Sequence, residues 1–149
     1  MRFNWTGSFC NYEEGRGYTL TPLPSDGKRK RWEFQLDKRT PLQFVGNDQT
    51  RWETDRHFVT DLGSIPAFLQ WMFNPAEYTL AFLFHDSGCI HKGMFRKDAS
   101  MAEFIFLPMT RAEIDGMLRD LIRAEGGSWL HAWQIYLGVR AYAICSGKR

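Results

Sequence analysis

Hydrophobic and polar positions follow different periods in the two halves of the chain. Up to about residue 60 the pattern is that of strands, and in residues 31–36 (RWEFQL) polar and apolar residues alternate. Alternation is typical of a half-buried β-strand, because successive side chains point to opposite faces. Composition and flanking turn residues predict further strands at 18–21, 41–45 and about 50–59. We expect these strands to form one small antiparallel sheet.

After residue 64 the apolar residues recur with the period of helices. Residues 64–66 (Ser-Ile-Pro) combine a hydroxyl cap with a first-turn proline, which predicts a short helix that runs to about Phe73. A second helix is predicted at 76–87, where a glycine follows. Residues 92–108 have a mixed pattern, because 104–107 (FIFL) is as typical of a buried strand as of a helix. We predict a loop with a short helix for that segment.

Two more helices have clear beginnings. Thr110 and Glu113 form a capping box, and apolar residues with the spacing of one helical face follow it: Ile114, Met117, Leu118, Leu121 and Ile122. Ser128 then caps a last helix at 129–145, which is apolar nearly all round. Because this helix contains Arg140 and is short for a membrane span, we predict that it is a buried core helix.

These elements predict an α+β fold in one domain that covers residues 1–149. Its N-terminal part, residues 1–60, is expected to be β-rich, and residues 64–146 are expected to be helical. The small antiparallel sheet would pack on a C-terminal bundle of about four helices. The length of 149 residues is usual for one domain, and no repeat or linker divides the sequence.

The charge balance argues against nucleic acid as a partner. The net charge is only +2, from 19 basic and 17 acidic residues. The one local excess, Lys28 to Arg31, follows turn residues; it could contact phosphates, but it is more typical of a solvated hairpin tip. Aromatic residues make up 15% of the chain, which is enough for a stable core and equally allows an exposed aromatic face for a partner. The partner class stays open between a small molecule, a lipid and a protein.

Cysteine usage and the termini bear on the compartment. Cys10, Cys89 and Cys145 are odd in number and form no C-x-x-C pair, which argues against a disulfide scaffold and a zinc knuckle. A reducing compartment fits best. We expect no signal peptide, because residues 1–5 lack an apolar region, and no transmembrane segment.

Ionisable residues at three places could form a site. Asp61 lies at the predicted junction of the last strand and the first helix, where it could bind a metal or merely cap backbone N–H groups. His85 and Asp86 lie on the second helix beside an apolar surface. Adjacent residues on a helix point about 100° apart, so Asp86 could bind a metal while His85 acts as a base. A histidine whose hydrogen bonds are satisfied in the core is the alternative.

Asp115 is the third candidate, and it lies beside the apolar stripe of its helix. It could orient His85, or it could be a first-turn acid favoured by the helix dipole. His91 and Asp98 are additional possible ligands, whereas His57 and His131 look isolated. Ser64 does not lie in a G-x-S-x-G motif, so a serine hydrolase is not predicted.

The spaced combination of these motifs resembles the family called domain of unknown function 1353. The motifs are FVTDLGSIP at 58–66, FHD at 84–86, RAEID at 111–115 and YLGVR at 136–140, and the resemblance covers roughly residues 17 to 143. That family is found mainly in tailed bacteriophages and prophages, so the resemblance implies a phage-encoded protein of the host cytoplasm or the virion. Two departures are Ser-Gly-Cys at 87–89 and a long segment at 93–109, which leave Asp115 and Asp98 as alternatives for the family's acid; the distance to the last helix favours Asp115.

A looser similarity exists to phospholipase A2-type sites, in which a helical His-Asp pair holds water and calcium. His85, Asp86 and Asp115 could have those roles, although the calcium loop and disulfides of that group are missing. We therefore expect a metal-assisted hydrolase with His85, Asp115 and Asp61 as catalytic residues. Asp86 and Asp61 would bind a divalent metal, calcium or zinc. The alternative is a non-catalytic virion, assembly or host-interaction protein in which the same cluster is a structural polar network.

Overall fold

The computed structural model describes residues 5–10, 20–22, 34–36, 42–55, 59–60 and 75–147. This part of the chain is α+β and contains eight strands, a short 3-10 helix and three α-helices. The strands are β1 (Gly7–Cys10), β2 (Leu20–Pro22), β3 (Phe34–Leu36), β4 (Gln43–Gly46), β5 (Arg51–Glu53), β6 (Val59–Thr60), β7 (Gly93–Lys97) and β8 (Ile105–Pro108). The helices are η1 (Pro75–Tyr78), α2 (Thr79–His91), α3 (Arg111–Ala124) and α4 (Trp129–Cys145).

The strands form two antiparallel sheets, whereas the sequence pattern predicted one. The larger sheet has five strands in the order β1-β4-β5-β7-β8, and the smaller has three in the order β2-β3-β6. The predicted strand at 50–59 is in fact two strands, β5 and β6, which belong to different sheets. Alternation along a strand reports which residues are buried but not which strand is the neighbour, and the neighbour decides how many sheets form.

The prediction of a loop with a short helix at 92–108 was wrong. Strands β7 and β8 form a hairpin there, with Gly93 opposite Pro108 and Arg96 opposite Ile105. The polar residues that looked like a helix start lie in the connection, where the backbone N–H of Met101 donates to the carbonyl of Asp98 at 3.0 Å. Because β7 pairs with β5, the sheet takes two of its strands from the region predicted to be helical.

The helices that begin with a capping residue agree closely with the sequence. In α3 the capping box of Thr110 and Glu113 is present, and in α4 the Ser128 hydroxyl accepts the backbone N–H of His131 at 3.1 Å. Helix α2 begins later and ends later than predicted, at Lys92, whose φ of 56° stops it. The predicted helix at 64–73 lies outside the described residues, so the structure describes three α-helices where about four were expected.

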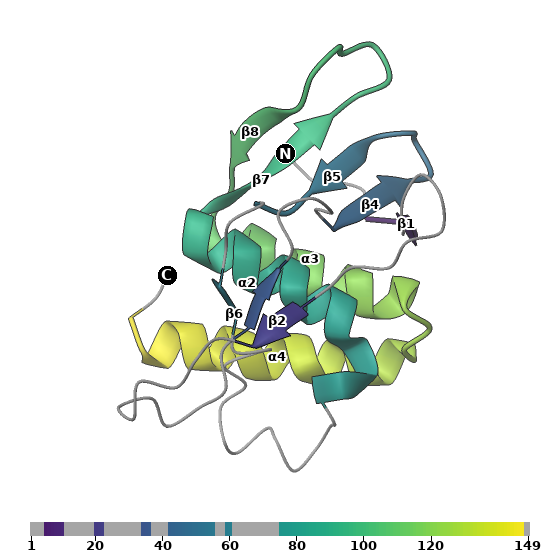
Figure 1. Ribbon diagram of the computed structural model, residues 1–149. Coiled ribbons are helices and arrows are strands. Elements are labelled where there is room, and N and C mark those ends of the chain that lie inside the picture. Colours follow the sequence, from purple (N-terminus) through teal and green to yellow (C-terminus); the bar gives the residue numbers. More distant parts are fainter. Residues whose placement is uncertain are drawn as a thin grey trace.

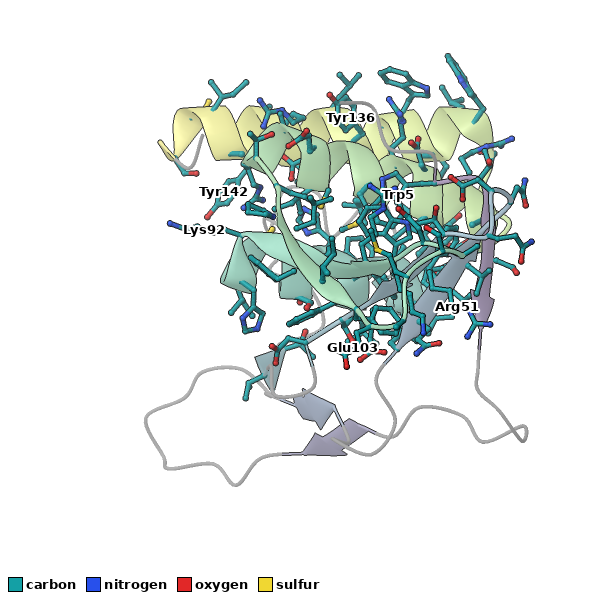
Figure 2. The ribbon with its side chains drawn as sticks, turned by 90° about the horizontal axis from the view of Figure 1, so that it is seen from above. Trp5, Arg51, Lys92, Glu103, Tyr136 and Tyr142 are labelled. Carbon is teal, nitrogen blue, oxygen red and sulfur yellow. The ribbon has the colours of Figure 1, made fainter. Side chains whose placement is uncertain are left out.

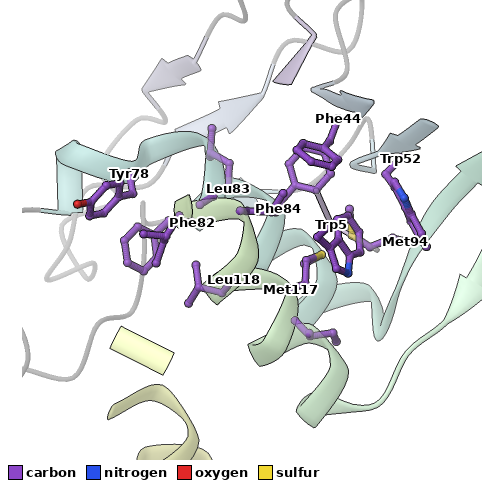
Figure 3. Packing of buried hydrophobic residues seen from close by; sticks show 14 of the residues in the cluster. Trp5, Phe44, Trp52, Tyr78, Phe82, Leu83, Phe84, Met94, Met117 and Leu118 are labelled. Atoms are coloured by element: carbon purple, nitrogen blue, oxygen red, sulfur yellow. The ribbon is translucent and has the colours of Figure 1, made fainter. Parts of the chain in front are cut away.

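The core lies between the larger sheet and helices α2 and α3, and α4 packs against α3 on the far side (Figure 1). Five fully buried residues come from the predicted stripe of α3: Ile114, Met117, Leu118, Leu121 and Ile122. Aromatic residues of the sheet meet them, and the Trp5 ring centroid lies 4.4 Å from that of Trp52 (Figure 3). Each such side chain contributes about 1.5–3 kcal/mol by its burial, which is the main support of the fold.

Helix α4 is not the buried core helix that its composition predicted. Only its small or branched residues Ala132, Ile135, Val139 and Ala143 are buried. Trp129, Leu130 and Leu137 are exposed by 63, 60 and 59%. Side chains of α4 project outward along its whole length (Figure 2). Within the described residues, no helix has both the length and the hydrophobicity needed to cross a bilayer.

Glu125 fixes the start of α2 against the end of α3. Its carboxylate accepts the backbone N–H groups of Leu80 at 3.2 Å and of Ala81 at 2.8 Å, so an acid satisfies the first turn of α2. Tyr78, at the cap position, provides no such side-chain bond. Burial raises the pKa of Glu125, although the two N–H groups act in the opposite direction. This contact joins the first turn of α2 to the C-terminal end of α3.

Candidate functional site

His85 and Asp115 are in direct contact. The Nε2 atom of His85, on α2, lies 2.8 Å from Oδ1 of Asp115, on α3. The Asp115 side chain is completely buried and His85 is only 7% exposed. The sequence pattern placed Asp115 beside the apolar stripe, and its full burial was not predicted. A buried imidazole and a buried carboxylate both need polar partners, and this hydrogen bond satisfies one atom of each.

Asp115 also binds two arginines. Arg111, one turn earlier on α3, donates from Nε to Oδ1 at 2.8 Å. Arg140 of α4 donates from Nη1 to Oδ2 at 3.1 Å. Burial alone would raise the pKa of Asp115, but the hydrogen bond from His85, the charge of His85 and Arg111 lower it below its usual value. The lowered pKa favours the anionic form of this carboxylate, which joins three helices.

His85 holds its proton more tightly than an ordinary histidine. Burial lowers its pKa, but the Cys89 sulfur, the hydrogen bond to Asp115 and the Asp86 carboxylate outweigh burial and raise the pKa from 6.5 to about 9. Each of these neighbours stabilises the protonated ring over the neutral one, and together they outweigh the cost of burial. The ring is therefore protonated at neutral pH, and its neutral form, the only one that can accept a proton, becomes the main form only as the pH rises through about 9.

Cys89 is a neighbour of His85 that the sequence analysis did not connect with the site. Its Sγ atom lies 3.6 Å from Nε2 and 3.8 Å from Nδ1 of His85. Because the two ring nitrogens are almost equally distant, the sulfur cannot lie along the lone pair of either one. The spacing of four residues on α2 was the available signal, because residues i and i+4 share a helix face.

Asp86 lies on the other side of the imidazole from Asp115. Its Oδ1 atom is 4.0 Å from Nδ1 of His85, beyond hydrogen-bond distance, as expected for adjacent residues on a helix. Its Oδ2 atom accepts the hydroxyl of Thr60, the last residue of β6, at 2.6 Å. Asp61 follows Thr60 in the chain and lies outside the described residues, so the structure does not test its predicted role.

A complete metal site is not found within the described ranges. No group of three or more His, Cys, Asp or Glu side chains in them is arranged to hold a metal ion. Asp86 contributes one carboxylate, and any further protein ligands would come from residues such as Asp61 that lie outside these ranges. The donor present is an oxygen, which suits a hard cation such as calcium better than zinc.

Two other candidate ligands are away from His85. Asp98, at the end of β7, pairs with Arg96 through two hydrogen bonds of 2.8 and 3.0 Å. His91 lies near Asp55, with Nε2 and Oδ1 3.9 Å apart. Of the alternatives Asp115 and Asp98, the structure therefore places Asp115 against the imidazole.

His131 is not isolated, contrary to the sequence-based prediction. Its Nδ1 atom is 3.0 Å from the hydroxyl of Tyr78, which is buried where η1 meets α2. Tyr78 also contacts a carboxylate oxygen of Glu77 at 3.2 Å. This contact ties the first turn of α4 to the start of α2, and no sequence motif indicates it. His57 lies outside the described residues.

The arrangement supports one kind of chemistry best. A buried carboxylate fixes the ring of His85 through Nε2, and the opposite nitrogen faces a second carboxylate. When Nε2 carries a proton and donates it to Asp115, Nδ1 of the neutral ring has a lone pair available. An imidazole held in this way can act as a general base on a water or substrate hydroxyl.

Comparison with known proteins places the chain in a family. Among curated proteins nothing matches the chain significantly, and the same holds for solved structures. The model of the family described as protein of unknown function (DUF1353) matches residues 36–139. The matched region contains His85, Asp86 and Asp115, whereas residues 17–35 and 140–143 of the expected resemblance lie outside it. The chain therefore belongs to the DUF1353 family of proteins of unknown function.

Proposed function

We propose that the protein is a hydrolase in which His85 is the catalytic base. The observation that carries the proposal is the 2.8 Å hydrogen bond between Nε2 of His85 and the fully buried Asp115. It leaves Nδ1 on the side of Asp86. Asp115 keeps the imidazole in one orientation. In the neutral ring, which the raised pKa of about 9 favours only in alkaline solution, Nδ1 takes the proton of the attacking water.

A divalent cation would complete this site. Asp86 supplies one ligand, and we propose Asp61 as another because it follows Thr60, whose hydroxyl binds Asp86. Carboxylate and hydroxyl oxygens favour calcium over zinc. The cation would act as a Lewis acid on the substrate carbonyl or phosphoryl oxygen. The residues of this chain provide the base, its orientation and at least one carboxylate ligand.

The resemblance to the phage-rich family supports placing this hydrolase among phage-encoded proteins that act in the host cytoplasm or the virion. The looser similarity to phospholipase A2-type sites supports an ester bond as the target, because His85, Asp86 and Asp115 could have the corresponding roles. The ester substrate class is therefore proposed from this analogy between sites alone.

A non-catalytic function is the second candidate, and one observation favours it. Asp115 accepts hydrogen bonds from α2, α3 and α4 at once and is fully buried, which is what a structural polar network requires. In this case the protein is a virion, assembly or host-interaction component. The cluster would then fix how the helices pack and would not turn over a substrate.

Hydrolysis of p-nitrophenyl acetate and p-nitrophenyl butyrate, with calcium or with a chelator, separates the two candidates. The wild type is compared with His85→Ala, Asp86→Asn and the matched control His91→Ala, a partly exposed histidine on the same helix. Catalysis predicts turnover that His85→Ala abolishes while its circular dichroism spectrum stays that of the wild type. Asp86→Asn should remove the calcium dependence, and His91→Ala should change neither.

Other results would contradict the hydrolase or remove the cation from the proposal. A wild type that hydrolyses neither ester above the rate of His85→Ala, with a melting temperature that falls sharply in that variant, contradicts the hydrolase and supports the structural network. If calcium neither changes the rate nor shifts the melting temperature, the cation is removed from the proposal while the base remains.

A further inference from the structure

A pocket with a volume of about 540 Å³ lies away from His85, between the C-terminal half of α3, the start of α4 and the residues that lead into β1. Its wall includes three tryptophans and three charged residues: Trp5, Trp129, Trp133, Arg119, Asp120 and Arg123. All of its lining residues belong to the described part of the chain. The volume is in the usual range for sites that bind small organic molecules.

Arg119 is held rigidly in the wall of this pocket. Its guanidinium lies 4.8 Å from the ring centroid of Trp133 and 5.4 Å from that of Tyr136. Its Nε atom donates to Oδ1 of Asp120 at 2.6 Å. Within the described residues, the two terminal nitrogens of Arg119 have no acceptor in the protein. A guanidinium fixed by stacking and by one carboxylate presents these two donors with little loss of entropy on binding.

Arg123 adds a second cation one helical turn further along α3. Its Nη1 atom donates to the carbonyl of Gly127 at 3.0 Å, and no other acceptor for it lies in the described part of the chain. Residues four apart lie on the same face of a helix, so Arg119 and Arg123 line the same side of the pocket. The one carboxylate in the wall, Asp120, is already paired with Arg119. The pocket therefore has an excess of positive charge.

The tryptophans supply flat apolar surfaces in the same pocket. Trp129 is 63% exposed although it lines the pocket, and its ring centroid lies 5.9 Å from that of Trp133. Trp5 is almost fully buried and closes the inner end, where it packs on Trp52. An exposed tryptophan beside unpaired arginine donors matches a ligand with a flat ring and a negative group.

We propose that this pocket binds a planar aromatic molecule that carries a sulfonate, carboxylate or phosphate group. The anion is bound by Arg119 and Arg123, and the ring lies against Trp129. The site is distinct from the His85 centre, because neither His85 nor Asp115 lines the pocket. Its nearest residue on α3 is Arg119, four residues beyond Asp115 and about 6 Å further along the helix axis. It does not depend on the proposed hydrolase activity.

Two fluorescent probes with the same ring system test the proposal. One is 8-anilinonaphthalene-1-sulfonate, which is an anion, and the other is N-phenyl-1-naphthylamine, which lacks the sulfonate. Binding of both is titrated to the wild type and to Arg119→Met, Arg123→Met and Trp129→Ala. The matched controls are Arg51→Met, an exposed arginine on β5, and Leu130→Ala, an exposed apolar residue that does not line the pocket.

We expect either arginine variant to weaken binding of the sulfonate probe by about tenfold or more, since a hydrogen bond to a charged group is lost. Binding of the neutral probe should change by less than about twofold in the same variants. Trp129→Ala should weaken the binding of both probes. The two control variants should bind both probes as tightly as the wild type. If Arg119→Met does not fold, Arg123→Met and the salt dependence of sulfonate binding give the answer.

Two results would overturn the proposal. One is equal affinity of the wild type for the charged and the neutral probe. The other is that Leu130→Ala weakens binding as much as Trp129→Ala, because the probes would then lie on the exposed apolar side of α4 and not in the pocket.

Discussion

His85 and Asp115 are separated by 30 residues in sequence, and yet their side chains lie 2.8 Å apart between two helices. Asp115 is fully buried and His85 is 7% exposed, so the charge on each side chain is stabilised by the other. The same carboxylate binds Arg140 of α4, which makes Asp115 the point where α2, α3 and α4 are joined.

Replacing the buried carboxylate should be far more costly than replacing an exposed one on the same helix. Asp115→Asn removes the negative charge that faces His85, Arg111 and Arg140, and we expect a loss of about 3 kcal/mol in the free energy of unfolding. Asp120→Asn, which breaks the partly exposed pair with Arg119, should lose less than about 1 kcal/mol. Urea unfolding at pH 7 measures both, and equal losses would show that Asp115 has no special role.

The raised pKa of His85 predicts a stability that declines in alkaline solution. The folded state binds the His85 proton more tightly than the unfolded state does. The contribution of this proton to the free energy of unfolding is therefore complete below pH 6.5 and is lost as the pH rises to about 9. At 1.36 kcal/mol per pKa unit, the loss should be about 3 kcal/mol.

Urea unfolding of the chelator-treated protein between pH 6 and pH 10 measures this loss. His85→Gln is the control, because its stability should lack this component over the same interval. Parallel curves for the two proteins would contradict the raised pKa.

Two glutamates should affect stability in opposite directions as the pH changes. Burial raises the pKa of Glu125 in the folded protein. Its contribution to the free energy of unfolding is therefore present below the usual pKa of a glutamate and is lost as the pH rises through the folded-state pKa. Hydrogen bonds from the backbone and side chain of Thr110 lower the pKa of Glu113, so its contribution is present above 4.5 and is lost as the pH falls.

The stability difference between wild type and Glu125→Gln should therefore shrink from pH 4 to pH 7, and that between wild type and Glu113→Gln should grow. Urea unfolding at several values in this interval measures both differences. Changes of the same sign in the two variants would refute the assignment.

Two glycines should respond oppositely to an added methyl group. A Cβ on Gly93 would collide with the backbone carbonyl of Leu107 across the β7–β8 hairpin, and we expect Gly93→Ala to lose about 2 kcal/mol. A Cβ on Gly116 meets nothing within 4 Å, and alanine is the better helix former, so Gly116→Ala should gain up to about 1 kcal/mol. Melting temperatures measured by circular dichroism give both signs, and a tolerated Gly93→Ala would mean that the hairpin is packed differently.

The candidate site was predictable in its members but not in its contacts. His85, Asp86 and Asp115 were selected from the residue types and the motif spacing, and the structure brings His85 and Asp115 together. The two arginines on Asp115 and the sulfur of Cys89 were not selected. Arg111 lies four residues before Asp115, and Cys89 lies four residues after His85, a spacing that allows contact on a helix. Spacing permits a contact, and only the neighbouring elements decide whether it forms.

By itself the sequence determined the local features of this protein. The capping residues Thr110 and Ser128 set where α3 and α4 begin, and the apolar period of α3 selected its buried face, because caps and helical periods involve only nearby residues. Tertiary structure alone decided that the strands form two sheets, that 93–108 contributes a hairpin and that α4 exposes an apolar side. These outcomes depend on partners distant in sequence, since an apolar residue gains the same free energy against any apolar surface.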